Sequence, residues 1–348
     1  MMIFYTVVLF IIFAVFIFIV ETAFVVLSPF FKEKEIPFDP DLRDAEEKDY
    51  EPSVTKENVF FNVKNERIDA YLYLPDKYSE PLPCIIMNTG FGGTKEMFLE
   101  RYAKVFNSAG FAVLTYDYRH FGKSEGNPRQ LYSMNKQLED CAAAIKFARS
   151  RKEIHADKII IWGTSGGAGY GLIIAASDNR IACISCQCGA LDHKADSQLA
   201  IRRDGFLSYL PLIFHGQRDK ARQRFGLEPH HIPIVGTPGK PAIIKAPGAY
   251  EGYSRIASEG AKNKLCAQIM LTPHKNPINY AHKVKCPVLV QVCENDNVAN
   301  PVGSMNTANI LGDKALVKKY PIGHFDIYFG KNFQQSVEDQ IVFFKNNV

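Results

Sequence analysis

The most constraining feature of the sequence is a sharp glycine-rich turn between a strand-like and a helix-like stretch. The apolar stretch Lys158–Trp162 leads directly into Gly163-Thr164-Ser165-Gly166-Gly167, and the helix-like stretch Ala168–Ala176 follows. Glycine permits a turn that is too tight for β-carbons beside the serine, and such a turn exposes the serine hydroxyl at the N-terminus of the helix. We therefore predict that Ser165 is a nucleophile. The alternative is an ordinary tight strand-to-helix connection.

An acidic residue and a histidine follow Ser165 in the order that a serine nucleophile requires. A serine hydroxyl is a weak nucleophile until a base accepts its proton and an acid orients that base. The strand-like stretch Val288–Cys293 precedes Asp296, and the next one, Leu316–Tyr320, precedes His324. We predict that His324 is the base and Asp296 the acid. Asp296 is favoured over the acidic residue two positions before it, which lies closer to the strand end and is less free to reach across.

Two backbone amides are the expected partners of the negative charge that develops when the serine attacks a carbonyl group. One is the N–H of Gly166, directly after the serine, and the other should come from the loop after the first central strand. At that place the sequence has the glycine-rich loop Asn88-Thr89-Gly90-Phe91-Gly92-Gly93. We predict that the N–H groups of Phe91 and Gly166 form an oxyanion hole. A merely flexible turn is the alternative.

The rest of the chain alternates strand-like and helix-like stretches. Strands are expected over Val59–Val63, Ile68–Leu74, Cys84–Asn88, Ala112–Tyr116, Lys158–Trp162, Ile181–Cys186, Val288–Cys293 and Leu316–Tyr320, and helices over Glu96–Ser108, Met134–Ser150, Ala168–Ala176, Asn300–Leu311 and Phe333–Lys345. This alternation predicts an α/β fold, in which a mostly parallel sheet is covered by helices on both faces.

The alternation stops between residues 191 and 285, where proline and glycine are frequent. Because a structureless loop of that length is uncommon in a compact domain, we expect a cap subdomain over 191–285, inserted between core segments 57–190 and 286–348. It should lie over the C-terminal edge of the sheet, where open α/β sheets bind ligands. The basic run from Arg218 to Arg224 in this cap is expected to be a solvated helix face, or else a contact with anionic lipid headgroups or a substrate carboxylate.

The N-terminal residues 1–31 are almost entirely apolar, and Glu21 is their only charged residue. Twenty such residues in a helix span roughly 30 Å, the thickness of a bilayer core. We predict an uncleaved transmembrane anchor. A signal peptide would need a basic start, a shorter apolar run and a cleavage site, and a buried core helix is the third alternative. Residues 32–56 are rich in charge and proline and are predicted to be a tether.

The positive charges beside the apolar segment predict its orientation. Four cations follow the segment and no lysine or arginine precedes it: Lys32, Lys34, Arg43 and Lys48. By the positive-inside rule, the globular part of this single-pass membrane protein should face the cytoplasm.

On these motifs the chain resembles the α/β-hydrolase superfamily from about Val59 to Val348. It is most similar to the capped branch near the serine aminopeptidase, X-Pro dipeptidyl-peptidase-like and dienelactone hydrolase-like groups. The stretches that carry the resemblance are Gly90-Phe91-Gly92-Gly93-Thr94-Lys95-Glu96, Asp117-Tyr118-Arg119-His120-Phe121-Gly122-Lys123-Ser124, Trp162-Gly163-Thr164-Ser165-Gly166-Gly167, Asp296-Asn297-Val298-Ala299-Asn300-Pro301 and Gly323-His324-Phe325-Asp326. The resemblance implies an α/β-hydrolase fold, a Ser165–His324–Asp296 triad and a structural role for Arg119.

One residue departs from the resembled pattern. Such hydrolases usually have histidine before the first glycine of the oxyanion loop, and this chain has Thr89 there. In the resembled hydrolases this histidine supports the loop, and the threonine hydroxyl should replace it only in part. We therefore expect the substitution to affect the geometry of the oxyanion loop and to leave the triad intact.

The function predicted from these residues is that of a membrane-anchored serine hydrolase that cleaves an ester or thioester of a small-molecule or lipid-like acyl substrate through an acyl-enzyme. A peptidase or amidase with the same triad is the second hypothesis, and a non-catalytic binding protein of the same fold is the third. The sequence does not predict an oligomeric state.

Composition narrows the remaining possibilities. A net charge of +4 is too small to indicate a nucleic-acid partner. The sequence has no phosphate-binding loop, no dinucleotide fingerprint and no metal-ligand spacing, so no cofactor and no metal are predicted. Cys183, Cys186 and Cys188 lie in an apolar strand and are expected to be buried free thiols.

Overall fold

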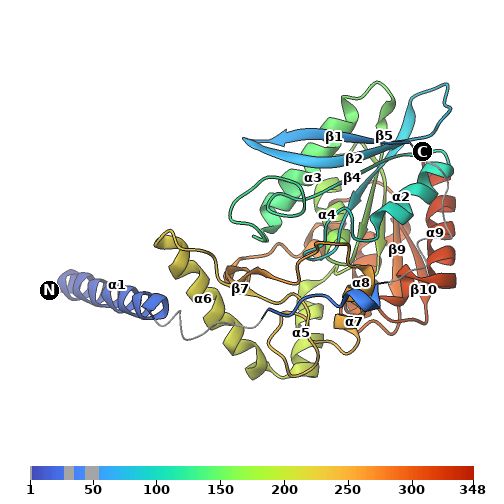
Figure 1. The fold of residues 1–348 in the computed structure, drawn as a ribbon. Helices are drawn as coiled ribbons and strands as arrows, with labels where there is room; N and C mark the ends of the chain where they lie inside the picture. Colours follow the sequence, from blue (N-terminus) through green and yellow to red (C-terminus); the bar gives the residue numbers. More distant parts are fainter. Residues whose placement is uncertain (1, 27–34, 44–54) are drawn as a thin grey trace.

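An eight-stranded sheet forms the centre of the computed structural model, which describes residues 2–26, 35–43 and 55–348 (Figure 1). Its strand order is β1-β2-β4-β3-β5-β6-β9-β10. The strands are β1 Thr55–Val63, β2 Glu66–Leu74, β3 Leu82–Asn88, β4 Ala112–Tyr116, β5 Ile154–Thr164, β6 Ile181–Gln187, β9 Val288–Cys293 and β10 Ala315–Tyr320. Strand β2 pairs antiparallel with β1 and β4, and the other neighbouring strands pair parallel. The predicted mostly parallel α/β sheet is confirmed.

Five helices cover the two faces of this sheet: α2 Leu99–Ser108, α3 Met134–Arg149, α4 Ala168–Ala175, α8 Pro301–Leu311 and α9 Gly330–Lys345. Successive strand residues point to opposite faces. Accordingly, Ile159 and Ile161 of β5 belong to a buried cluster with α3, α4 and α8, whereas Ile160 and Trp162 belong to a second cluster with α2 and α9. Helices therefore lie on both faces, as the alternation predicts.

Some predicted boundaries differ from the structure. Helix α2 begins at Leu99 and not at Glu96. The preceding residues form a turn, in which the Met97 N–H donates to the Thr94 carbonyl at 3.0 Å and Phe98 has a left-handed φ of 66°. A left-handed residue ends the regular helical hydrogen bonding, so the helix cannot extend further toward its N-terminus.

Between β6 and β9 the chain forms three α-helices and a small sheet, together with short 3₁₀ helices, instead of continuing the alternation. The helices are α5 His193–Asp204, α6 Leu210–Arg224 and α7 Ala249–Ile256, and the two-residue strands β7 His231–Ile232 and β8 Leu265–Cys266 pair antiparallel. These helices lie together at one end of the central sheet (Figure 1). The expectation of a solvated basic face on α6 is wrong for Arg218, which is buried.

The N-terminal helix α1, Met2–Val26, projects away from the sheet (Figure 1). Residues Tyr5–Val25 are long and apolar enough to cross a membrane, a property that a signal sequence shares. Of the predicted tether, residues 35–43 lie against α7: the Phe38 ring stacks on Tyr253 with centroids 6.0 Å apart. The predicted tether ends earlier than expected, because Thr55 and Lys56 already belong to β1. Its residues 32–34 and 44–54, including Lys32, Lys34 and Lys48, lie outside the described residues.

Candidate active site

Ser165 occupies a turn that only glycine neighbours can form. Strand β5 ends at Thr164, and Ser165 has a φ of 52°, in the left-handed region that most side chains avoid. A β-carbon at Gly163 would lie 2.5 Å from the carbonyl oxygen of Gly167, and one at Gly167 would lie 2.2 Å from that of Thr89. Both glycines are therefore needed for the backbone to pass this point. The strand–turn–helix geometry predicted around Ser165 is present.

The structure brings His324 and Asp296 together with Ser165. His324 Nε2 lies 3.1 Å from Ser165 Oγ, and His324 Nδ1 lies 2.6 Å from Asp296 Oδ2. The other carboxylate oxygen, Oδ1, accepts the N–H groups of Val298 at 2.7 Å and Ala299 at 2.9 Å. Because these amides fix the carboxylate, Asp296 can orient the imidazole so that Nε2 faces the serine hydroxyl.

The environment of His324 changes its affinity for a proton. Burial of the imidazole by itself lowers the pKa, but the negative charge of Asp296 and the hydrogen bond to it act in the opposite direction, and the pKa of His324 is raised to about 9. The imidazolium form is therefore favoured. A site of this kind stabilises the protonated base that forms once a serine hydroxyl has given up its proton.

The loop after β3 places Phe91 opposite the residue that follows the serine. A β-carbon at Gly166 would lie 3.4 Å from the backbone nitrogen of Phe91, and one at Gly90 would lie 3.9 Å from Ser165 Oγ. The two amides nominated from the sequence thus belong to adjacent backbone segments beside the serine. The Thr89 hydroxyl donates to the Gly93 carbonyl at 3.3 Å, and so connects the two ends of this loop.

A buried ion cluster holds the far end of the same loop. Lys95 Nζ lies 2.5 Å from Asp69 Oδ1 and 2.7 Å from Asp117 Oδ2, and the Lys95 N–H donates to Asp117 Oδ1 at 2.8 Å. Lys95 is fully buried and lies 4.5 Å from the centroid of the Tyr71 ring. Removing one member of such a cluster leaves an unpaired buried charge, so the cluster strongly favours a single loop conformation.

Arg119 is paired, as the resemblance to the hydrolases implies. Its guanidinium contacts Asp140, lies 2.7 Å from Glu139 Oε2 and donates to the Lys136 carbonyl at 2.9 Å. These partners belong to α3, and the side chain is buried. Arg119 therefore fastens the loop after β4 to α3.

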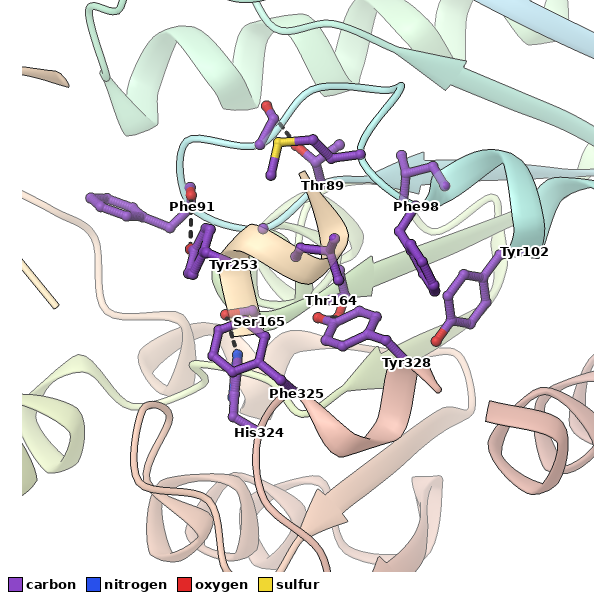
Figure 2. A pocket seen from close by; sticks show the side chains of 15 residues that line it. Thr89, Phe91, Phe98, Tyr102, Thr164, Ser165, Tyr253, His324, Phe325 and Tyr328 are labelled. Atoms are coloured by element: carbon purple, nitrogen blue, oxygen red, sulfur yellow. Dashed lines mark hydrogen bonds between the residues drawn. The ribbon is translucent and has the colours of Figure 1, made fainter. Parts of the chain in front are cut away.

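A small apolar cavity of about 30 Å³ lies beside Ser165 (Figure 2). Rings and aliphatic side chains dominate its walls, and its lining residues are Thr89, Gly90, Phe91, Gly93, Met97, Phe98, Leu99, Tyr102, Thr164, Ser165, Tyr253, Ile256, His324, Phe325 and Tyr328. No carboxylate occurs in this described lining. The cavity has room for a few atoms and offers them an apolar surface.

Tyr253 and Tyr328 border the cavity but belong to no motif that we recognised in the sequence. The Tyr253 hydroxyl donates to the Phe91 carbonyl at 3.0 Å, and Tyr328 lies 2.5 Å, oxygen to oxygen, from Thr164. Tyr253 comes from α7 of the inserted region and reaches the site only through tertiary packing. Tyr328 lies four residues after His324, and this proximity is the only signal in the sequence that could have indicated it.

The cysteines beside the elbow are buried free thiols, as predicted. Cys183, Cys186 and Cys188 are buried and form no disulfide. The Cys188 sulfur lies 3.5 Å from the Thr164 hydroxyl. Cys188 therefore packs beneath the residue that precedes the serine.

Residues 64–309 match the family described as X-Pro dipeptidyl-peptidase (S15 family). The chain belongs to the S15 family. The matched region of this S15 chain runs from the turn before β2 into α8, so it includes Ser165 and Asp296 and ends before His324.

Individual relatives of the S15 chain point to the same superfamily. The quorum-quenching protein AidA of Acinetobacter baumannii is 37% identical over 294 residues, which are 84% of this chain and 95% of AidA. The thiohydrolase aneE of Aspergillus aculeatus is 33% identical over 145 residues, 42% of this chain and 45% of aneE. The α/β-hydrolase GrgF of Penicillium sp. sh18 superposes with a TM-score of 0.72 at 22% identity, over 84% of this chain and 99% of GrgF. The chain is an α/β-hydrolase that resembles X-Pro dipeptidyl-peptidase-like enzymes.

Proposed function

We propose that this hydrolase cleaves a carboxylic ester or thioester through Ser165, His324 and Asp296. The observation that supports this most directly is the chain of contacts from Ser165 Oγ to His324 Nε2 at 3.1 Å and from His324 Nδ1 to Asp296 at 2.6 Å. It joins a nucleophile, a base and an orienting acid within hydrogen-bonding reach. The left-handed turn at Ser165 aims the hydroxyl toward the cavity in which an acyl group would lie.

In the first half of the reaction, Ser165 Oγ attacks the carbonyl carbon while His324 Nε2 accepts the hydroxyl proton. The carbonyl oxygen becomes an oxyanion, to which the N–H groups of Phe91 and Gly166 donate. Collapse of the tetrahedral intermediate re-forms the carbonyl bond and breaks the bond to the alcohol or thiol. The leaving group takes the proton from His324, and the acyl group remains on Ser165.

In the second half, water attacks the acyl-enzyme and His324 accepts a proton from it. The oxyanion forms again at Phe91 and Gly166. Its collapse breaks the bond between the acyl carbon and Ser165 Oγ, which takes the proton from His324 as the carboxylic acid is released. The charge of Asp296 stabilises the imidazolium in both halves. The raised pKa of His324 matches this requirement.

The apolar lining beside Ser165 supports an acyl substrate. Its described residues include aromatic rings and Met97 but no carboxylate that would bind the free amino group of a peptide. The relative named as a thiohydrolase favours a thioester among the possible acyl donors. A peptidase remains the second candidate, because the matched family is described by an X-Pro dipeptidyl-peptidase.

We further propose that α1 anchors the enzyme in a membrane, with the globular part toward the cytoplasm. The support is the length and exposure of Tyr5–Val25, together with the cations that follow it in the sequence. Within the globular part, we propose that 57–190 and 286–348 form the core, and that 191–285 form a cap over Ser165. The reach of Tyr253 from α7 to Phe91 supports that arrangement.

A substrate panel distinguishes the two candidate activities. The full chain in detergent micelles is assayed with p-nitrophenyl acetate, an acetyl thioester and an Ala-Pro p-nitroanilide. We expect hydrolysis of the ester and the thioester that is lost in Ser165→Ala and retained in Ser150→Ala, a control at an exposed serine. Cleavage of the anilide in preference to both acyl substrates would replace the esterase proposal by the peptidase.

A further inference from the structure

Large apolar side chains gather on and beside α6 of the inserted region. We use the name α6 surface for six of them, each between 37% and 75% exposed: Phe206, Leu207, Ile213, Phe214, Phe225 and Leu227. The other large exposed apolar side chains of the described globular part are distributed over several elements. Single exposed apolar residues are normal, but a group of them marks a surface that is covered by something else.

The α6 surface meets the C-terminal end of α1. The rings of Phe24 and Phe214 stack with centroids 6.1 Å apart, and Glu21 forms an ion pair with Arg224 at the end of α6. In Figure 1 the last turns of α1 lie beside α6, while the rest of α1 extends away from the protein. The exposed apolar side chains of α1 and those of α6 are therefore neighbours.

We propose that the α6 surface docks on the lipid bilayer in which α1 is embedded. This inference rests on the proposed membrane anchoring. Glu21 is the only charged residue of α1, and it lies near the end of the apolar span. Because a charge in the hydrocarbon core is costly, Glu21 and its partner Arg224 belong at the headgroup level. The α6 side chains next to Arg224 then lie at the boundary between headgroups and acyl chains.

The chemistry of the α6 surface fits a lipid interface better than a protein partner. The exposed apolar side chains of α6 itself, Ile213 and Phe214, lie in its first half, and the cations Lys220, Arg222 and Arg224 lie in its last two turns. Interfacial helices combine these two residue classes, because rings enter the acyl boundary while cations remain among anionic headgroups. A second copy of this chain could cover the apolar side chains, but α6 contacts the end of α1, so the bilayer that holds α1 already lies beside this surface.

Tryptophan fluorescence in proteoliposomes tests the docking. The chain has a single tryptophan, Trp162, which is fully buried, so a new tryptophan can be measured above a constant background. The variants Phe225→Trp and Leu207→Trp place the probe on the α6 surface. Phe16→Trp places it in the middle of α1, and Phe60→Trp places it on an exposed position of β1, which is 47% exposed. Each full-length variant is reconstituted in phosphatidylcholine–phosphatidylglycerol vesicles, with or without lipids brominated near the headgroup end or deep in the acyl chains.

The expected result is quenching of both α6 variants by the shallow bromines, by about twofold, because an interfacial side chain lies about 5–10 Å into the headgroup–acyl boundary. Phe16→Trp should be quenched more by the deep bromines, and Phe60→Trp by neither. If Phe16→Trp is quenched but an α6 variant is not, the anchor is present and the docking proposal is wrong. If Phe16→Trp is unquenched, the membrane anchoring itself is wrong. An α6 emission that is unquenched but changes with protein density would assign the surface to a second copy.

Discussion

The hydroxyl of Tyr253 donates to the carbonyl oxygen of Phe91 at 3.0 Å, and so joins α7 of the inserted region to the loop that faces Ser165. Tyr253 is buried between the Phe38 ring, 6.0 Å away, and the Phe325 ring, 5.3 Å away. Phe38 follows the N-terminal helix and Phe325 follows His324. One side chain thus contacts the segment after α1, the proposed oxyanion loop and the neighbour of the proposed base.

The first prediction concerns this hydrogen bond. Tyr253→Phe keeps the ring and removes the donor, so the Phe91 peptide should lose one of its restraints. A typical hydrogen bond contributes about 1 kcal/mol, which corresponds to roughly a five- to tenfold lower kcat if the restraint is needed in the transition state. Because the bond positions the peptide and does not touch the substrate, KM should remain within about twofold.

Tyr250→Phe is the matched control, because its hydroxyl lies on the same helix but donates to the Pro37 carbonyl at 2.8 Å. Steady-state kinetics of the full chain with p-nitrophenyl acetate give both constants. An equal loss of kcat in the two variants would show a general effect of α7 packing and would contradict a specific role for Tyr253.

The second prediction is a pH dependence. His324 must be neutral to accept the serine proton, and its pKa is raised to about 9 by the charge of Asp296, which outweighs the effect of burial. A raised pKa keeps the base protonated to higher pH, so kcat/KM should increase with pH and level off only above about pH 9. The measurement is kcat/KM for p-nitrophenyl acetate between pH 6 and 10.

Asp296→Asn removes the charge that raises this pKa. We expect a loss of kcat of about 10⁴-fold, because the imidazole is left in the wrong tautomer, and a limb of the pH profile at lower pH for the residual activity. If kcat/KM of Asp296→Asn rises over the same pH range as that of the wild type, the group that titrates is not His324.

The third prediction contrasts two adjacent glycines. A β-carbon at Gly167 would lie 2.2 Å from the Thr89 carbonyl oxygen, which is backbone and cannot yield cheaply. A β-carbon at Gly166 would make its closest contact at 3.4 Å, within the ordinary range. Gly167→Ala should therefore lower the free energy of unfolding by about 3 kcal/mol or more, as overpacking of a buried site does. Gly166→Ala should fold as the wild type does and keep activity, since only its N–H is required.

Denaturant unfolding followed by far-UV circular dichroism measures both glycine variants. Similar unfolding midpoints for Gly167→Ala and the wild type would mean that the backbone around Ser165 differs from the tight turn described above.

The fourth prediction concerns acyl length. Because the cavity beside Ser165 measures about 30 Å³, kcat/KM for p-nitrophenyl acetate should exceed that for the hexanoate. We expect kcat/KM for the acetate to be at least about tenfold higher, because a single methylene group that does not fit a pocket already produces a difference of about that size. Met97→Ala removes a wall of the cavity and should shift the preference toward the hexanoate. A preference of the wild type for the longer ester would show that the acyl group binds elsewhere.

The parts of the structure that depend on local sequence were predictable. The turn at Ser165 follows from its glycines, which are required by backbone contacts of 2.2 and 2.5 Å. His324 and Asp296 meet Ser165 because parallel strands bring the loops at their carboxyl ends to one edge. Each of the three residues follows a different strand of this sheet. The order in which Ser165, Asp296 and His324 follow their strands along the chain was therefore sufficient to predict them.

Contacts that arise only through tertiary packing could not be predicted. Arg218 lies in a basic run that looks solvated, yet it is buried, because the neighbouring Asp219 accepts the backbone N–H groups of His230 and Gln268 and draws that helix face inward. Tyr253 has no motif, since its role depends on where α7 packs. The partner of Glu21 is Arg224, which lies far away along the chain.

Labelling by a fluorophosphonate shows directly whether Ser165 is the nucleophile. The full chain is treated with the probe, and the modified peptide is located by mass spectrometry. We expect one phosphonylated peptide containing Ser165, no labelling of Ser165→Ala and slower labelling of Asp296→Asn. Labelling of Ser165→Ala at the wild-type rate, or no labelling of the wild type, would mean that Ser165 is not the nucleophile.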